Sequence, residues 1–112
     1  MNIEVFLYEK LSKDLPVPVY TEHQENDPES FVIIDKTGSS KRNHLVSSTV
    51  AFQSYAKSKH EAAELNEKVK EAVEALIRFD EVSDCKLNSD YPFNDLSTKR
   101  HRYQAVFDIY HY

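Results

Sequence analysis

The sequence predicts an α+β fold: a mostly antiparallel sheet with two helices packed on one face. Two observations lead to this class. Apolar residues recur at helical spacing near the N-terminus and again after residue 58, while β-branched and aromatic residues alternate in several other segments. The expected order is helix, strand, strand, strand, helix, strand, strand, and runs of strands indicate antiparallel pairing. The 112 residues suit one domain, 1–112.

The first helix is expected to end near Asp14, because Pro16 cannot continue it. Its apolar stripe consists of Ile3, Phe6, Leu7, Leu11 and Leu15. Next, the alternation in VPVYTEH contains a proline, which predicts a short strand at a sheet edge. After the polar turn QENDPES, the run FVIID is apolar but too short for a helix, so it predicts a buried strand over Phe31 to Asp35.

The segment KTGSSKRN, residues 36–43, contains the only glycine and predicts a mobile hairpin loop. It leads into HLVSSTVAFQSYA, which is rich in β-branched and aromatic residues and predicts a long strand. One face of this strand carries Val46, Ser48, Val50 and Phe52.

The clearest element is the second helix, expected from about Glu61 to Phe79. Ser58 and Glu61 have the S-x-x-E spacing of a capping box, in which each side chain satisfies a backbone amide of the first turn. A continuous apolar stripe, opposite a face of lysines and glutamates, predicts packing on the sheet. The stripe consists of Ala62, Leu65, Val69, Ala72, Val73, Leu76 and Ile77.

The C-terminal part is expected to contain a short strand near Cys85 to Leu87, a loop over NSDYPFNDLS, and a final alternating strand. One face of that strand carries Tyr103, Ala105, Phe107 and Ile109, and the other carries Arg102, Gln104, Val106, Asp108, Tyr110 and Tyr112. The second face is half polar and half apolar, which suits a subunit contact; exposure to solvent is the alternative. We expect the strand to form a sheet edge that pairs with another subunit.

Several kinds of chemistry find no support in the sequence. The five histidines have neither the spacing of metal ligands nor a cysteine companion, Cys85 has no activating motif, and GSSKR lacks the second glycine and following lysine of a phosphate loop. We therefore expect no enzyme, cofactor or metal site. No apolar run approaches the roughly 20 residues that span a bilayer, which predicts no membrane contact. The single cysteine and the absence of a leader at the start indicate a reducing, intracellular setting.

The basic residues Lys99, Arg100 and Arg102 lie beside aromatic residues, a combination found in proteins that stack single-stranded nucleic acid. The net charge of −5 and the strand-like alternation of the aromatics argue against this function. As exposed charges, the three residues would contribute little to stability. We favour contact with an acidic patch on another copy or a protein partner.

The chain resembles the tail terminator, or head-tail joining, proteins of long-tailed bacteriophages and prophages. The resemblance lies in the helix IEVFLYEKL, then PVY and a polar turn before FVIID, and the strand HLVSSTVAFQSYA followed at once by EAAELNEKVKEAVEAL. It ends with DLSTKRHRYQAVFDIYHY and covers almost the whole chain in order. It concerns element order and residue character rather than a catalytic fingerprint.

The resemblance implies a structural protein, not an enzyme. Such proteins form a ring, commonly a hexamer, on the last ring of the tail tube, where they stop tube growth and bind the head connector. The resemblance thus also implies that the chain is assembled in the bacterial cytoplasm and resides in the virion. Other phage neck or minor tail components, and a small nucleic-acid- or peptide-binding module, are the alternatives. The interface residues expected from the basic and aromatic positions are Lys36, Lys41, Arg42, Lys99, Arg100, Arg102, Tyr110 and Tyr112.

Overall fold

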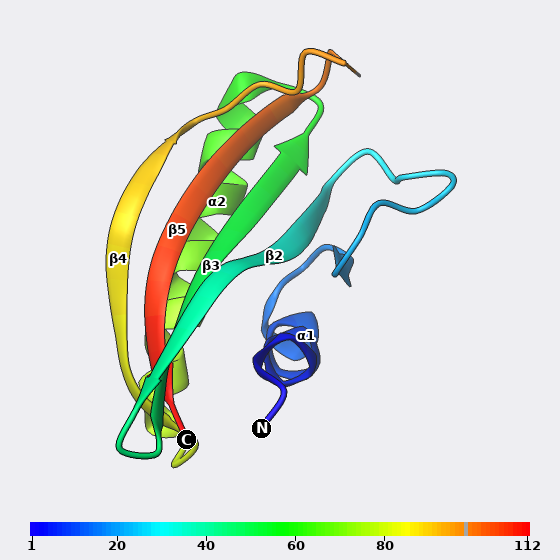
Figure 1. Cartoon of the computed structure of the whole chain (residues 1–112). Helices are drawn as coiled ribbons and strands as arrows, with labels where there is room; N and C mark the ends of the chain where they lie inside the picture. The colour runs from blue at the N-terminus through cyan, green and yellow to red at the C-terminus, as the bar shows by residue number, and fades with distance from the viewer. Residues whose placement is uncertain (98) are drawn as a thin grey trace.

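The fold is a five-stranded sheet with two helices on one face, as the sequence predicts. The structure is a computed structural model that describes residues 1–97 and 99–112. Its elements are α1 (Ile3–Asp14), β1 (Val19–Tyr20), β2 (Phe31–Arg42), β3 (Leu45–Ala56), α2 (Lys59–Glu74), a 3₁₀ turn η1 (Ala75–Arg78), β4 (Val82–Pro92) and β5 (His101–His111). The strands lie in the order β1-β2-β3-β5-β4, and all neighbours are antiparallel except β1 and β2. Figure 1 shows α2 along one face of the sheet, with α1 beside β2.

Both helices begin with a side-chain cap. The Asn2 side-chain oxygen accepts a hydrogen bond from the Val5 amide at 3.2 Å, and the Ser58 hydroxyl accepts one from the Glu61 amide at 3.1 Å. Both expected helices and the expected cap at Ser58 are thus confirmed, whereas the cap at Asn2 was not predicted and α2 ends earlier than Phe79. Its last turn tightens into η1, which leaves Ile77 50% exposed instead of packed on the stripe.

One hydrophobic core lies between the helices and the sheet. Alternate strand positions face it, which is the period-2 pattern of a half-buried sheet. The core residues on the strands include Val32, Ile34, Val50, Phe52, Ala105, Phe107 and Ile109, and those on the helices include Ile3, Phe6, Leu7, Leu11, Leu65, Val69 and Val73. The opposite face of the sheet, which we call the open face, carries no helix.

The β2–β3 hairpin is longer than the sequence predicts. Residues 36–42, expected as a mobile loop, are paired with β3 down to Arg42 and Leu45. The turn consists of Asn43 and His44 alone, with φ of 49° and 70°, so the loop prediction is wrong. Gly38 lies inside β2 without a positive φ, and therefore forms no part of the turn.

The C-terminal half departs from the prediction in two ways. β5 lies between β3 and β4, so it is not the edge strand that we expected. β4 extends over residues 82–92, well beyond the expected short strand, and it forms the edge instead. β2 contains a bulge between Lys36 and Gly38, and β4 contains two register shifts, between Val82 and Asp84 and between Leu87 and Ser89.

Candidate interface

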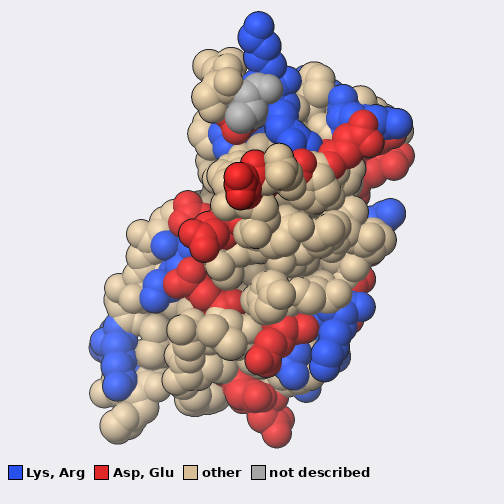
Figure 2. All heavy atoms as spheres, turned by 90° about the vertical axis from the view of Figure 1, so that its right-hand side faces the viewer, with Lys and Arg blue, Asp and Glu red and all other residues tan. Residues whose placement is uncertain are grey.

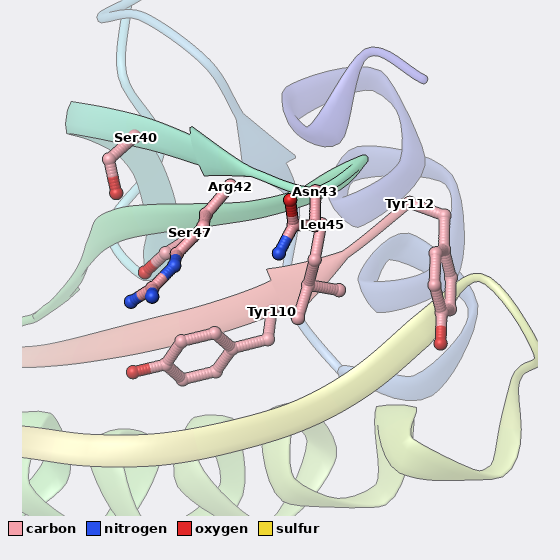
Figure 3. A pocket seen from close by; sticks show the side chains of 7 residues that line it. All are labelled: Ser40, Arg42, Asn43, Leu45, Ser47, Tyr110 and Tyr112. Atoms are coloured by element: carbon pink, nitrogen blue, oxygen red, sulfur yellow. The ribbon is translucent and has the colours of Figure 1, made fainter.

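A hollow of about 630 Å³ lies on the open face at the hairpin end of the sheet. Strand register brings its residues together, because Ser40 pairs with Ser47 and Ser47 pairs with Tyr110 across β2, β3 and β5. Three residues expected at an interface line this hollow: Arg42 from the hairpin, and Tyr110 and Tyr112 from the distant end of the chain (Figure 3). The hollow is completed by Ser40, Asn43, Leu45 and Ser47.

The hollow combines a cation, aromatic rings and small polar groups. Arg42 is exposed, Tyr112 is 62% exposed, and the Lys86 Nζ lies 5.7 Å from the centre of the Tyr110 ring. No carboxylate, histidine or cysteine lines it. Such a surface suits a protein segment that carries a carboxylate or an aromatic side chain, since arginine and tyrosine are favoured in protein interfaces.

Lys36 and Lys41 lie on the other side of the hairpin. Lys36 pairs with Val50 and Lys41 with Val46, so both positions belong to the face that carries the helices. Lys36 lines a second hollow of about 350 Å³ together with residues of the N-terminus and the pair Ser48 and His111. The structure therefore separates these two lysines from Arg42, although all three belong to one exposed arm.

At the far end of the open face, Arg100 and Arg102 belong to a group of rings and cations that we call the aromatic–arginine cluster. It consists of His23, Phe31, Tyr55, Phe93, Arg100 and Arg102. The rings of Phe31 and Tyr55 stack with centres 4.5 Å apart and planes 7° apart. Arg100 lies over Phe31 at 5.1 Å, and Arg102 lies over Phe93 at 4.2 Å.

Both arginines also donate hydrogen bonds to backbone carbonyl groups. Arg100 donates hydrogen bonds to the carbonyl oxygens of Pro28 and Glu29 at 2.6 and 2.8 Å, and Arg102 donates to the Phe93 carbonyl at 2.6 Å. The cluster thereby fastens two loops, before β2 and before β5, to the end of the sheet. Arg100 and Arg102 are half-buried and hydrogen-bonded within the chain, so the prediction that they are exposed charges is wrong. Lys99 is exposed and has a positive φ of 58°.

The pKa values of Tyr55, in the cluster, and of Asp27, which bonds to His23, are shifted by burial and by hydrogen bonds. Burial raises the pKa of the Tyr55 hydroxyl, which outweighs the opposing effect of Arg102. Burial of Asp27 acts to raise its pKa too, but hydrogen bonds from His23 and the Gln24 amide prevail and lower it. At neutral pH Tyr55 therefore keeps its hydroxyl proton, and Asp27, which bonds to His23 of the cluster, is a carboxylate.

Ser48 and His111 form a buried pair near the other end. The Ser48 hydroxyl and His111 Nε2 lie 2.8 Å apart, and burial lowers the pKa of His111. His111 Nδ1 lies 3.3 Å from the Tyr112 carbonyl oxygen, so a proton on Nδ1 and the Ser48 proton satisfy both ring nitrogens. With exposed fractions of 1% and 3%, these side chains act as core residues.

Cys85 is half-buried against the core, and burial raises its pKa to about 11, which keeps the thiol protonated. Within residues 1–97 and 99–112, no three His, Cys, Asp or Glu side chains group so as to hold a metal ion. In the same part of the chain no helix is long and apolar enough to cross a membrane.

The prediction missed exposed apolar side chains on β4 and α1. Leu87 and Tyr91 on β4 and Phe93 just after it are 45%, 38% and 43% exposed, and Val5 and Tyr8 are 50% and 45% exposed. A signal was present in NSDYPFN, where Ser89, Tyr91 and Phe93 recur at strand spacing. Proline and asparagine nearby favoured a loop instead.

Neither a protein-family model nor a curated protein matches the chain. The fold and the exposed residues define a small α+β domain with an open sheet face.

Proposed function

We propose that the chain is a ring subunit of a phage or prophage tail terminator, which caps the tail tube and joins it to the head connector. The observation that carries this proposal is the distal half of the β2–β3 hairpin. From Asp35 to Arg42 every residue of β2 is exposed, on both faces, although the strand is paired with β3 on either side of the bulge at Thr37. A paired arm without cover inside its own subunit is a natural surface for a neighbour.

The element order also supports this function. The resemblance to tail terminators rests on a helix, a short strand, a strand, a loop, a long strand, a long helix and a final strand in that order, and elements of this kind follow one another along the chain. The molecule is elongated, 43 × 25 × 24 Å, with the hairpin at one end and the aromatic–arginine cluster at the other. In a ring, one end would meet the tube and the other the connector.

Nucleic-acid binding receives less support. The guanidinium groups of Arg100 and Arg102 are bonded to carbonyl oxygens and lie over aromatic rings, so a phosphate would have to displace contacts within the subunit. Another neck or minor tail component would use the same exposed arm, and the genes beside this one distinguish the two structural roles. A major tail protein gene on one side and connector genes on the other favour the terminator.

The test is electron microscopy of the purified protein with tail tubes assembled from the neighbouring major tail protein. We expect rings in solution and a cap at one end of each tube, with tubes of defined length. The variant Arg42→Glu/Tyr112→Ala removes the cation and an aromatic ring of the hollow and should reduce capping, while Lys13→Glu on the exposed end of α1 serves as a matched surface control. Tubes that grow unchanged with the wild-type protein present would refute the proposal.

A further inference from the structure

The sheet has two strand edges that no element of the described chain covers. β1 pairs with β2 only at Val32 and Ile33, and β2 is exposed without a partner on its outer edge from Asp35 to Arg42. At the other side, β4 is the last strand, and no strand of the described chain pairs with its outer edge, although the Val82 amide bonds to the Phe79 carbonyl and the Cys85 amide to the Asp84 side chain. Free edges present unpaired backbone groups, which bind another strand unless they are protected.

The two edges carry opposite charge. The exposed part of β2, residues 35–42, holds three basic residues and one acidic residue. The segment 80–92, which contains β4, holds four acidic residues and one basic residue. Attraction between the edges therefore favours contact of β2 with β4 over contact of either edge with itself.

The charges also stand at the same level of the sheet. Strand register places Lys41, Val46, His111 and Val82 in one row across all four long strands. The basic end of β2 and the acidic start of β4, with Glu81 just before it, are thus level. Two copies placed side by side without a shift along the strands would bring these charges together. A closed ring also requires that neighbouring copies are not shifted along its axis, because such a shift produces an open filament.

Apolar side chains flank both edges. Val5 and Tyr8 are exposed on α1, the helix beside β2, and Leu87 and Ile77 are exposed on β4 and on η1, which packs against β4. Figure 2 views the molecule from the side of α1 and β2, where uncharged groups form a broad central area with charged groups around it. An apolar centre with a polar rim is the usual arrangement of a protein interface, and the exposed Val5 and Tyr8 supply apolar groups on this side.

We infer that copies of this chain join head to tail, with the free edge of β2 from one copy lying antiparallel to β4 of the next. β2 and β4 run in opposite directions within the sheet, so copies related by rotation about an axis along the strands place them antiparallel. The contact would continue the sheet from subunit to subunit and bring Val5 and Tyr8 towards Leu87 and Ile77 of the neighbour. This inference deepens the proposed function, on which its ring geometry rests, by naming the surfaces that meet.

Cross-linking tests the contact. In a Cys85→Ser background, Ser39→Cys on β2 and Ser83→Cys on β4 place one exposed thiol on each edge. A short bismaleimide should link the double variant into a ladder of dimers, trimers and larger species that ends at the ring size. Each single variant should stay unlinked, because a head-to-tail contact never brings two identical positions together. The pair Ser39→Cys/Ser12→Cys, with both thiols on the side of α1 and β2, is the matched control.

A charge exchange gives a second, independent measurement. Lys41→Glu and Glu81→Lys should each weaken association by about tenfold or more, and the combined variant should recover it, because the pair is restored with its signs reversed. Dimers that stop at two copies, cross-links in the single variants, or a wild-type protein that remains monomeric by light scattering would each overturn the inference. If rings form and cap the tubes but the double cysteine variant gives no cross-linked ladder, the edge contact alone is refuted. If the ladder forms but the tubes are not capped, the proposed function alone is refuted.

Discussion

The Arg102 guanidinium donates a hydrogen bond to the Tyr55 hydroxyl at 2.7 Å, across neighbouring strands on the open face. The same group donates to the Phe93 carbonyl, so one side chain joins the sheet to the loop that follows β4. Arg102 therefore stabilises the fold of the chain itself.

Reversal of this charge should destabilise the monomer. Arg102→Glu removes a charged donor from two acceptors and places a carboxylate beside Tyr55, which we expect to cost about 2 kcal/mol or more in free energy of unfolding. Lys99→Glu, the same reversal at an exposed position, should change it by less than about 0.5 kcal/mol. Urea denaturation followed by circular dichroism measures both, and equal stabilities would show that the cluster contributes nothing.

The stripe of α2 and η1 can be tested with two adjacent residues. Leu76 is fully buried and Ile77 is 50% exposed. Leu76→Ala should lower the free energy of unfolding by about 2 to 5 kcal/mol, because it leaves a cavity in the core. Ile77→Ala should lower it by less than about 1 kcal/mol. An unchanged denaturation midpoint for Leu76→Ala would contradict this packing.

The hairpin turn predicts a stabilising substitution. His44 has a positive φ, which costs a residue with a side chain about 1 kcal/mol relative to glycine. His44→Gly should therefore raise the free energy of unfolding by up to about that amount, giving the Asn-Gly sequence preferred in such turns. His44→Ala, which keeps the strain, is the control. Thermal denaturation distinguishes them, and a less stable His44→Gly would argue against the two-residue turn.

His111 makes stability depend on pH. Burial lowers its pKa below the ordinary value of 6.5, so between the two values the unfolded chain binds more protons than the folded chain. The contribution is complete above about pH 6.5 and is lost as the pH falls towards the folded pKa. The unfolding midpoint of the wild-type protein should therefore be lower at about pH 5.5 than at about pH 7.5. In His111→Asn the part of this difference that His111 causes should disappear. A parallel decline in both proteins would contradict the assignment.

DNA binding should be absent. With Arg100 and Arg102 bonded inside the subunit and a net charge of −5, we expect no retention of short single- or double-stranded DNA at low salt. Fluorescence anisotropy over a salt series is the measurement. Tight binding that weakens steeply with salt, together with normal tails from a protein carrying Lys99→Glu, would favour the nucleic-acid alternative instead.

Local patterns in the sequence were sufficient for the two helices, the cap at Ser58 and most core-facing residues of β3 and β5. They failed where partners in the fold decide the outcome. Gly38 suggested a loop because glycine is common in turns, yet pairing with β3 keeps it in a strand, and Asn43 accommodates the turn.

Strand order was the other limit. The final strand ends the chain, but chain order does not determine which strand is an edge, and pairing with both β3 and β4 places β5 inside the sheet. The same limit affected the interface. Arg42, Tyr110 and Tyr112 meet only through the register of three strands, whereas Arg100 and Arg102 turn inward to aromatic rings that lie far away in sequence.

The bulge in β2 decides which way the hairpin arm presents its charges. Before it Lys36 lies on the face of the helices, and after it Gly38 pairs with Thr49, on the open face, because the extra residue Thr37 reverses the alternation. Arg42 consequently reaches the hollow with Tyr110 while Lys41 does not. A deletion of one residue here would exchange the two sides of the arm without altering its composition. The length of this segment, more than the identity of its residues, would then be the property under selection.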